Sequence, residues 1–506
     1  MKKSIERIRR AIRRMRYWGV QKFIVIVLRR SLVETDLAVD AFSARIAVEL
    51  SKAVTEDMKK NTVAMLSRAW RQQIRTLAGL PTSIPTVPKM DDLGAEMAFL
   101  MDHGVTLAPV FKLLAARRVL FSGQAYYNSW YLSRALRAIG WKADLYNWDE
   151  DPATQIYYHG EDFRVGDPEL STHEQCVAFY LNAVYGYDIF HFSNTNGISF
   201  GWRVAAIFNQ RYSDHSEIAM IKTLGKVLVY SNNGCLDGVS QTAFSKWKPE
   251  SPCTICRWQH EPSVCSDQKN LDWGRFRNSV IDYQCLLGGN RVDFNDDPSV
   301  HEVPEFYCLD PQVWDPVLEI PVGMRLPEVS SRTIRLYHAV GHKADRTRDD
   351  GVNIKSSHVY LPLIEKLQGE GMSLELIEPT GIPNKDVRFL QMQADIFLDM
   401  LSYGWFGANA REAMMLAKPV ICYIRPEWLE SLREEIPEYA EELPIISASP
   451  DTVEQVLRDL IVNPDKRREI GERSRHFAIK WHSSEAGGKR FDEIYSCLMR
   501  GDKMLR

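Results

Sequence analysis

Short apolar strands that end in loops of small or polar residues recur along this chain, in two consecutive series. The first series predicts strands at 118–121, 143–146, 187–192 and 226–230. The second predicts strands at 333–338, 374–377, 396–398 and 419–424, separated by helices at 356–368, 385–393 and 410–417. Strands that alternate with helices form parallel α/β sheets. The pattern therefore predicts two open α/β domains that face each other across a cleft, where small ligands usually bind.

The remaining sequence completes a predicted domain plan. The chain has 506 residues, a net charge of −3 and 45% hydrophobic residues, which is ordinary for a folded protein and excludes disordered and collagen-like chains. We expect a basic helical extension over 1–112 and an N-terminal α/β domain over 113–328. A C-terminal α/β domain over 329–480 and a last helix over 481–506 that packs back should follow.

The first thirty residues are strongly basic and amphipathic. Apolar residues three or four positions apart give one helical stripe, and cations lie between them: Lys2, Lys3, Arg7, Arg9, Arg10, Arg13, Arg14 and Arg16. Such a helix lies on an anionic membrane surface or presents a solvated face. Nucleic acid is an unlikely partner, because the rest of the chain shows no basic trend.

No apolar run here is long enough to span a membrane or to form a secretion signal. The run at 23–28 is far shorter than a spanning helix requires, and Arg29 and Arg30 follow it without a cleavage site. We therefore expect a cytoplasmic protein that is peripheral on the inner membrane face if residues 1–30 bind lipid. The proline-rich segment 81–88 is predicted to be a linker.

The segment 399–420 carries the most informative motif. It is predicted to be a strand end, a turn containing Gly404, Gly407 and Ala408, and the start of the helix at 410–417, which contains Glu412. Exposed backbone N–H groups at a helix start favour phosphate. A carboxylate about one turn into that helix can accept hydrogen bonds from sugar hydroxyls. The motif predicts a site for a phosphorylated sugar compound.

This motif resembles the donor-site signature of retaining nucleotide-sugar glycosyltransferases with two Rossmann-like domains, of the family four type. The family form is Glu, seven residues, then Glu-Ala-Met, a small residue and Gly-Lys-Pro-Val; here 412–420 matches from the second Glu onward. The resemblance implies that Glu412 binds the nucleotide ribose. It places Gly404 where the family has a Glu that contacts the donor sugar, so this chain departs from the pattern there.

The resemblance also implies cations at the donor pyrophosphate. Lys355 matches the family lysine before the next helix, and Arg346 and Arg348 are the candidates for a second cation. The loop 378–383 resembles the family loop that contacts the base. In the first α/β domain, Gly123 would line the cleft, and His191 either faces the cleft or is a satisfied histidine within the sheet.

Glycosyl transfer sets the chemistry that such residues would perform. The reaction passes through an oxocarbenium-like state while a nucleoside diphosphate leaves, and fixed donors stabilise the growing negative charge. Lys355, an arginine and the amides near Gly407 would supply those donors without a catalytic metal ion, as the family usually does. Retention of anomeric configuration is likewise implied by the resemblance alone.

Six of the nine cysteines lie within 235–308, and four of them form a candidate metal site. Cys253 and Cys256 form a C-x-x-C pair, with Cys235 before and Cys265 after it, inside a predicted cysteine-rich insertion at about 235–285. Four cysteines with such a pair can hold a structural zinc ion. The alternative is buried free thiols.

The sequence favours a glycosyltransferase that moves a sugar from a nucleotide-sugar donor to a glycan, lipid-linked or cell-surface precursor acceptor. The alternative is an inactive relative that binds a partner through its basic helices and cysteine block, which the glycine at position 404 would favour. A nucleotide-sugar epimerase is disfavoured, because 122–127 lacks a glycine-rich dinucleotide fingerprint.

Overall fold

The computed structural model describes residues 89–113, 115–123, 127–150, 160–193, 197–232, 234–235, 237–248, 250–286, 291–341, 343–502 and 504. The predicted basic helix at 1–30 and the linker at 81–88 lie outside these residues. Within them, no helix is both long and apolar enough to cross a membrane.

The first sheet has seven strands in the order β3-β2-β1-β4-β5-β6-β7. Its strands are β1 (Arg118–Ser122), β2 (Lys142–Asn147), β3 (Phe163–Arg164), β4 (Ile189–Phe192), β5 (Val227–Ser231), β6 (Tyr283–Leu286) and β7 (Val300–Glu302). The pairs β2–β3, β5–β6 and β6–β7 run parallel. Because β1 lies between β2 and β4, the strand order reverses between β1 and β4, as in doubly wound folds.

The second sheet has four parallel strands in the order β11-β10-β8-β9. They are β8 (Ile334–Tyr337), β9 (Leu374–Ile377), β10 (Ile396–Leu398) and β11 (Val420–Ile421). The first strand of this sheet, β8, lies between β9 and β10, so the strand order reverses between β8 and β10. In open α/β sheets ligands bind beyond the carboxyl ends of the strands at such a reversal.

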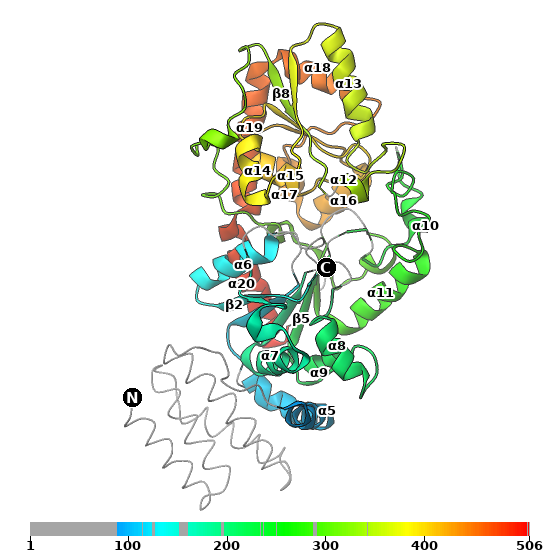
Figure 1. The fold of residues 1–506 in the computed structure, drawn as a ribbon, viewed down its shortest axis with the longest axis vertical. Coiled ribbons are helices and arrows are strands. Elements are labelled where there is room, and N and C mark those ends of the chain that lie inside the picture. The colour runs from blue at the N-terminus through cyan, green and yellow to red at the C-terminus, as the bar shows by residue number, and fades with distance from the viewer. Residues whose placement is uncertain are drawn as a thin grey trace, which may run out of the picture. The chain divides into compact units, whose positions relative to one another are not determined.

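Helices fill the connections (Figure 1). Among the described residues, the helices before β8 are α5 (Met90–Leu113), α6 (Asn128–Ala138), α7 (His173–Gly186), α8 (Trp202–Asn209), α9 (Ser216–Thr223), α10 (Gln241–Phe244) and α11 (Asp267–Val280). Those after β8 are α12 (Lys343–Arg346), α13 (Ser357–Gly369), α14 (Asn384–Gln391), α15 (Ala408–Met415), α16 (Pro426–Glu435), α17 (Pro437–Glu442), α18 (Val453–Val462), α19 (Pro464–His482) and α20 (Ser484–Arg500).

The chain divides into two compact units whose segments alternate along the sequence. The first includes the described residues up to Arg118, with Val165–Phe190 and Ser199–Val227. Its buried Asp188 carboxylate pairs with Arg118 at 2.6 Å and Lys226 at 3.1 Å. The second unit contains Val119–Arg164, His191–Ile198 and Leu228–Arg506, and therefore all candidate site residues of the sequence analysis.

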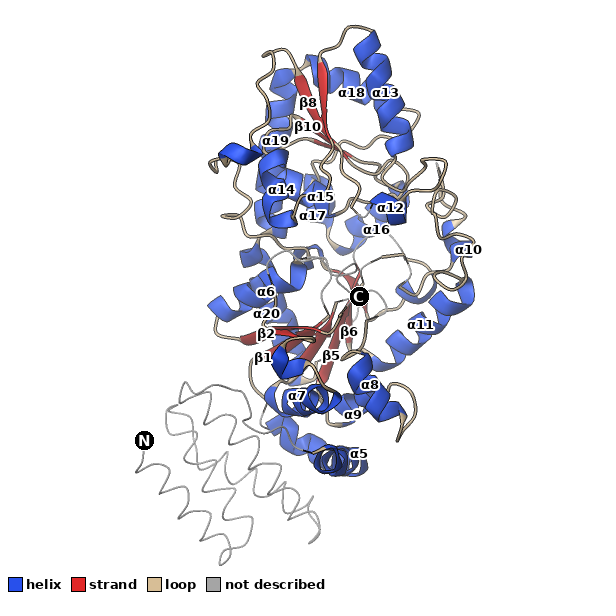
Figure 2. Ribbon diagram, in the orientation of Figure 1, coloured by secondary structure: helices blue, strands red, loops and turns tan. Residues whose placement is uncertain are grey.

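The core of the second sheet is a continuous apolar cluster. It combines strand residues such as Leu336 and Leu398 with Tyr360 and Leu367 of α13 and Leu457 of α18. Figure 2 shows β8 and β10 with α13 and α18 beside them. Burial of this cluster fixes the strand ends, and with them the loops that carry the candidate site.

The two predicted series of strands are confirmed, with corrections at their ends. The predicted strands 374–377 and 396–398 match β9 and β10. The last predicted strand, 419–424, is shorter, because β11 covers only Val420–Ile421. The helix predicted at 410–417 begins earlier, directly after Gly407, and ends at Met415 before a left-handed residue, Ala417 (φ 59°). Strands β3, β6 and β7 were not predicted.

Candidate functional site

The candidate site is built at the strand-order reversal of the second sheet. Loops leave the carboxyl ends of β8 and β10 there, and α13 and α15 begin beside them. Lys355 precedes α13, Asp399 follows β10, and Gly407 precedes α15. The fold thus brings together three segments that the sequence separates by tens of residues.

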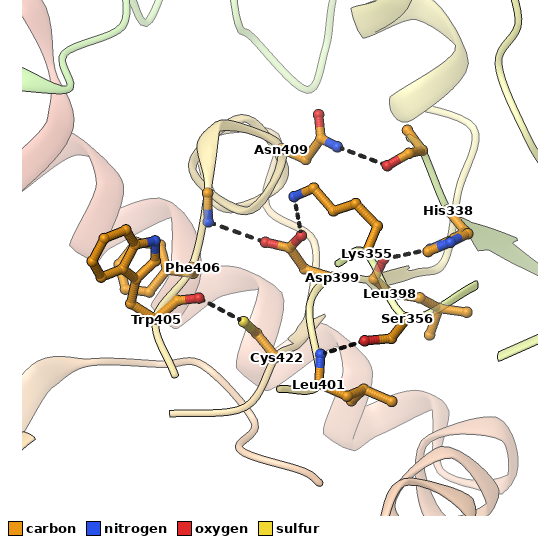
Figure 3. Close-up of polar contacts among 12 residues, drawn as sticks. His338, Lys355, Ser356, Leu398, Asp399, Leu401, Trp405, Phe406, Asn409 and Cys422 are labelled. Carbon is orange, nitrogen blue, oxygen red and sulfur yellow. Dashed lines mark hydrogen bonds and ion pairs between the residues drawn. The ribbon is translucent and has the colours of Figure 1, made fainter. Parts of the chain in front are cut away.

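Lys355 and Asp399 form the centre of the site (Figure 3). The Lys355 ammonium lies 2.7 Å from one carboxylate oxygen of Asp399, and both side chains are nearly buried. The backbone N–H of Gly407 donates to the other oxygen at 3.1 Å. One carboxylate therefore connects the lysine before α13 to the first turn of α15.

Asp399 is held as a carboxylate. Burial acts to raise its pKa, but the charge and hydrogen bond of Lys355 and the amides of Gly407 and Met400 outweigh burial, and the pKa is lowered. An ammonium group has three N–H donors, so the bond to Asp399 fixes Lys355 while leaving donors for a second anion. The amino termini of α13 and α15 add partial positive charge nearby.

A buried histidine connects the strand ends beside this centre. His338 follows β8, and its ring bonds to the Leu398 carbonyl at 3.0 Å and to the Ser357 hydroxyl at 2.8 Å. The Ser356 hydroxyl accepts the N–H of Leu401 at 3.0 Å. These contacts fix the start of α13 against the end of β10; Figure 3 shows those of His338 with Leu398 and of Ser356 with Leu401.

Glu412 lies within α15 and is 2% exposed. Its carboxylate accepts hydrogen bonds from the Tyr127 hydroxyl at 2.9 Å, from Gln391 at 2.6 Å and from Asn384 at 3.4 Å. Burial raises its pKa, while these donors and the charge of Lys355 act in the opposite direction. Glu412 and Lys355 are therefore close enough to interact electrostatically.

Glycine is favoured at positions 404 and 407 for different structural reasons. Gly404 has a φ of 92°, and a Cβ there would meet the Cβ of Arg425 at 2.9 Å, so its turn requires glycine. Gly407 has extended backbone, but a Cβ there would lie 3.3 Å from the Lys355 ammonium. Gly407 thus lies beside the Lys355 ammonium, and Ala408, the next residue, is the first of α15. Gly404 lies against Arg425 instead.

The predicted arginines lie in and after α12. Arg346 ends this helix, and one of its guanidinium nitrogens would lie 3.9 Å from a Cβ on Gly341. Arg348 donates to the Thr254 carbonyl at 2.8 Å and pairs with Asp350 at 2.7 Å. Arg348 is therefore engaged with the cysteine-rich segment, and its role at the pyrophosphate stays a prediction, as does that of Arg346.

The two predicted residues of the first sheet lie at its carboxyl edge and in its interior. Gly123 directly follows β1 with a φ of 84°, and its carbonyl accepts a hydrogen bond from the Ser193 hydroxyl at 3.0 Å. His191 is fully buried in β4, with its ring nitrogens at 2.6 Å from the Tyr495 and Ser231 hydroxyls. Burial lowers its pKa to about 3. This geometry is that of a satisfied histidine in the sheet, the alternative to a catalytic role.

The four cysteines of the predicted metal site surround α10 as free thiols. Cys235 and Cys253 pack on the apolar cluster of Val239, Phe244 and Trp247. In the part of the chain that the structure describes, no three histidine, cysteine or acidic side chains converge closely enough to hold a metal ion as they stand. The zinc site stays a prediction.

Three residues of the site were missed from the sequence. Asp399 had a usable signal, since a carboxylate directly after a buried strand lies at the ligand edge of a parallel sheet. Tyr127 and Gln391 had none, because their contact with Glu412 depends on the tertiary fold.

Comparisons with known proteins find similarity in structure only. No protein-family model and no curated protein sequence matches this chain. It is similar to sucrose-phosphate synthase from Thermosynechococcus elongatus, with 14% identity and a TM-score of 0.43, over 76% of this chain and 100% of that one. It is also similar to Anabaena HepE in complex with UDP (11%, TM-score 0.45, 75% and 100%) and to the wall teichoic acid polymerase TagF (13%, 0.36, 81% and 98%). At these identities the similarity concerns the fold alone.

Proposed function

We propose that this chain is a glycosyltransferase whose nucleotide-sugar donor binds at the carboxyl edge of the second sheet. The observation that carries the proposal is the centre formed by Lys355, Asp399 and Gly407 at the starts of α13 and α15. It combines a fixed cation, two helix amino termini and a glycine that admits close approach, which suits a diphosphate.

The proposed mechanism uses this centre to stabilise the leaving group. As the glycosidic bond to the diphosphate breaks, negative charge grows on the phosphate oxygens. The donors of Lys355 that are not used by Asp399 and the N–H groups at the start of α15 would bind that charge, and Arg346 is the proposed second cation. Because Asp399 holds Lys355 in place beforehand, little reorganisation is needed in the transition state.

The nucleoside would extend toward Glu412. Asn384, which contacts Glu412, directly follows the loop 378–383 that resembles the family's base-contacting loop. The side-chain amide oxygens of Asn384 (Oδ1) and Gln391 (Oε1) are buried without a hydrogen-bond partner among the described residues. These acceptors and the Glu412 carboxylate suit the hydroxyls of a ribose.

Several finer points belong to the proposal. They are retention of configuration, catalysis without a metal ion, and a glycan, lipid-linked or cell-surface precursor acceptor.

Residues 1–30 would hold the enzyme on the inner membrane face, so removing them should abolish sedimentation with anionic vesicles and preserve activity in solution. Equal sedimentation of both forms would contradict that role.

The second candidate is an inactive relative that binds a partner. The observation in its favour is Gly404, whose left-handed turn excludes the family glutamate. Without that carboxylate, a contact to the donor sugar is absent from this position.

A panel of nucleotide sugars tests the two candidates. The enzyme should slowly hydrolyse at least one donor, and Glu412→Ala should weaken binding of that donor by about 10-fold or more. Glu365→Ala, an exposed control on α13, should change neither. Stabilisation by a nucleotide without turnover of any donor would favour the binding protein.

A further inference from the structure

Tyr127, which directly precedes α6, contacts the carboxylate that the proposed function assigns to the ribose. Its hydroxyl donates to one oxygen of Glu412 at 2.9 Å, although 285 residues separate the two. Both side chains are 2% exposed, and both belong to the second compact unit. The proposed reaction gives this phenol no role, so the contact requires its own explanation.

Glu412 is buried too deeply for solvent to satisfy its charge. A carboxylate taken out of water is costly unless hydrogen bonds replace its hydration. Gln391 Nε2 donates to Oε2 at 2.6 Å, while the Tyr127 hydroxyl and Asn384 Nδ2 donate to Oε1 at 2.9 and 3.4 Å. Tyr127 is therefore the closer donor to Oε1, and the long contact of the amide is too weak to replace it.

The three donors come from two different helices. Asn384 and Gln391 are the first and last residues of α14, whereas Tyr127 precedes α6. A carboxylate that accepts hydrogen bonds on both oxygens, from two separate elements, has little freedom to rotate. Without the phenol, α14 alone would restrain Glu412.

The contact leaves acceptors for a sugar hydroxyl. A carboxylate has about four acceptor positions, two on each oxygen. Tyr127 and Asn384 occupy those of Oε1, and Gln391 occupies one of those of Oε2. The other position on Oε2 can accept a ribose hydroxyl, together with the amide oxygens of Asn384 and Gln391, which have no hydrogen-bond partner among the described residues. The phenol can therefore stay in place when a nucleoside binds.

An aromatic column fixes the Tyr127 ring. The ring packs on Tyr131 of α6, with ring centroids 5.5 Å apart, and on Trp314 at 6.1 Å. The indole N–H of the fully buried Trp314 donates to the Tyr131 hydroxyl at 3.1 Å. Arg475 of α19 donates to the Trp314 carbonyl at 2.6 Å and to the carbonyl of Met415, the last residue of α15. The column is thus bonded to the helix that carries the carboxylate, which holds the phenol in one position.

We propose that Tyr127 is a positioning residue for donor binding, whose hydroxyl fixes the Glu412 carboxylate in the orientation that accepts ribose hydroxyls. This inference rests on the proposed donor site. It adds to that site a residue beside α6, the helix that follows β1 of the first sheet. Both sheets then contribute to nucleoside recognition, although the phosphate centre belongs to the second sheet alone.

Nucleotide affinity tests this inference. The probe is whichever of UDP, GDP, CDP and ADP binds the wild-type chain most tightly in calorimetry. Tyr127→Phe keeps the ring and removes the hydroxyl, so it should weaken binding of that nucleotide by about 5–10-fold. The control is Tyr131→Phe, which removes a hydroxyl that bonds to Trp314 in the same column and should change the affinity by less than about 2-fold.

Three results of this comparison would overturn the proposal. They are an unchanged affinity of Tyr127→Phe, an equal loss in Tyr127→Phe and Tyr131→Phe, and tighter binding by Tyr127→Phe. The second would show a structural role for the whole column. The third would show that the phenol competes with the ribose.

A double-mutant cycle shows whether Tyr127 acts through Glu412. If it does, Tyr127→Phe should have no further effect on nucleotide affinity in a Glu412→Ala background. The same loss in both backgrounds would contradict the positioning role.

Urea unfolding of the same four chains measures the Tyr127–Glu412 contact without any nucleotide. The two substitutions should be coupled by about 5-fold or more in the unfolding equilibrium constant. Coupling in stability, with no nucleotide bound by the wild type, would refute the proposed donor site and the role of Tyr127 with it. Nucleotide binding by the wild type without any coupling would refute the role of Tyr127 alone.

Discussion

Among single residues, the proposed donor site depends most on one buried ion pair. Lys355 and Asp399 are 8% and 3% exposed, so each would be costly to bury without the other. The pair fixes the lysine close to Gly407, where an added Cβ would lie 3.3 Å from the ammonium, a tight contact. We therefore infer that Asp399 orients the Lys355 ammonium. The coupling free energy between the two side chains is measurable.

A double-mutant cycle should show that coupling. Lys355→Met leaves the Asp399 carboxylate buried without its cation and should cost about 3–5 kcal/mol of unfolding free energy. The double variant Lys355→Met, Asp399→Leu should lose less unfolding free energy than the two single variants lose together. The difference should be at least about 1 kcal/mol. Urea denaturation measures both.

The control for this cycle is the exposed pair of Lys366 and Glu454, at 2.8 Å. Its coupling should be much weaker than that of Lys355 and Asp399, because solvent screens both charges. Additive effects at Lys355 and Asp399 would show that the two side chains do not depend on each other.

Gly404 should tolerate no side chain. Its left-handed φ and the contact with Arg425 predict that Gly404→Ala destabilises the fold by about 1–3 kcal/mol. Gly404→Glu should be destabilised as well and gain no activity. Gly369→Ala is the control, since nothing lies within 4 Å of the added methyl. Thermal melting distinguishes them, and an active, stable Gly404→Glu variant would contradict this account.

Among the secondary-structure elements, β7 and α16 bring together two acidic residues, Glu435 and the buried Glu302. Burial raises the pKa of Glu302 in β7 to about 8; Glu435 of α16 acts in the same direction, while Arg291, Trp428 and Arg411 oppose it. Arg291 is bonded to Glu435. The folded state therefore holds a proton on Glu302 that the unfolded chain releases near its ordinary pKa.

This linkage predicts a pH-dependent stability. Because the folded pKa of Glu302 is raised, its contribution is present below about pH 4.5 and is lost as the pH rises toward about 8. Glu302→Gln should remove that part of the decline, whereas the exposed Glu430→Gln should not. Urea midpoints measured between these pH values test the difference, and parallel profiles for wild type and Glu302→Gln would contradict it.

The elements also show what the sequence can predict. Central strands such as β9 and β10 are apolar runs bounded by polar turns, and their positions follow from that pattern. The two-residue β3 and the strands β6 and β7 were missed. Strand β6 follows the cysteine-rich segment, where the alternation of strands and helices is interrupted, and β3 is too short to show a period.

At the scale of the whole molecule, the two parallel sheets were predictable and the site only in part. Lys355, Gly407 and Glu412 could be found because they belong to local motifs at strand and helix ends. Tyr127, Gln391 and the burial of His191 could not, because their partners come from distant segments. The domain boundary at 328–329 and the membrane role of residues 1–30 stay predictions.

The central claim is that the second sheet binds a diphosphate through Lys355. Calorimetric titration of the folded chain with UDP, GDP, CDP and ADP, and with the corresponding monophosphates, tests it most directly. We predict that at least one diphosphate binds more tightly than its monophosphate, and that Lys355→Met weakens it by about 10–100-fold while Lys366→Met does not. Binding of no diphosphate by the wild type, or equal binding by both variants, would contradict the claim.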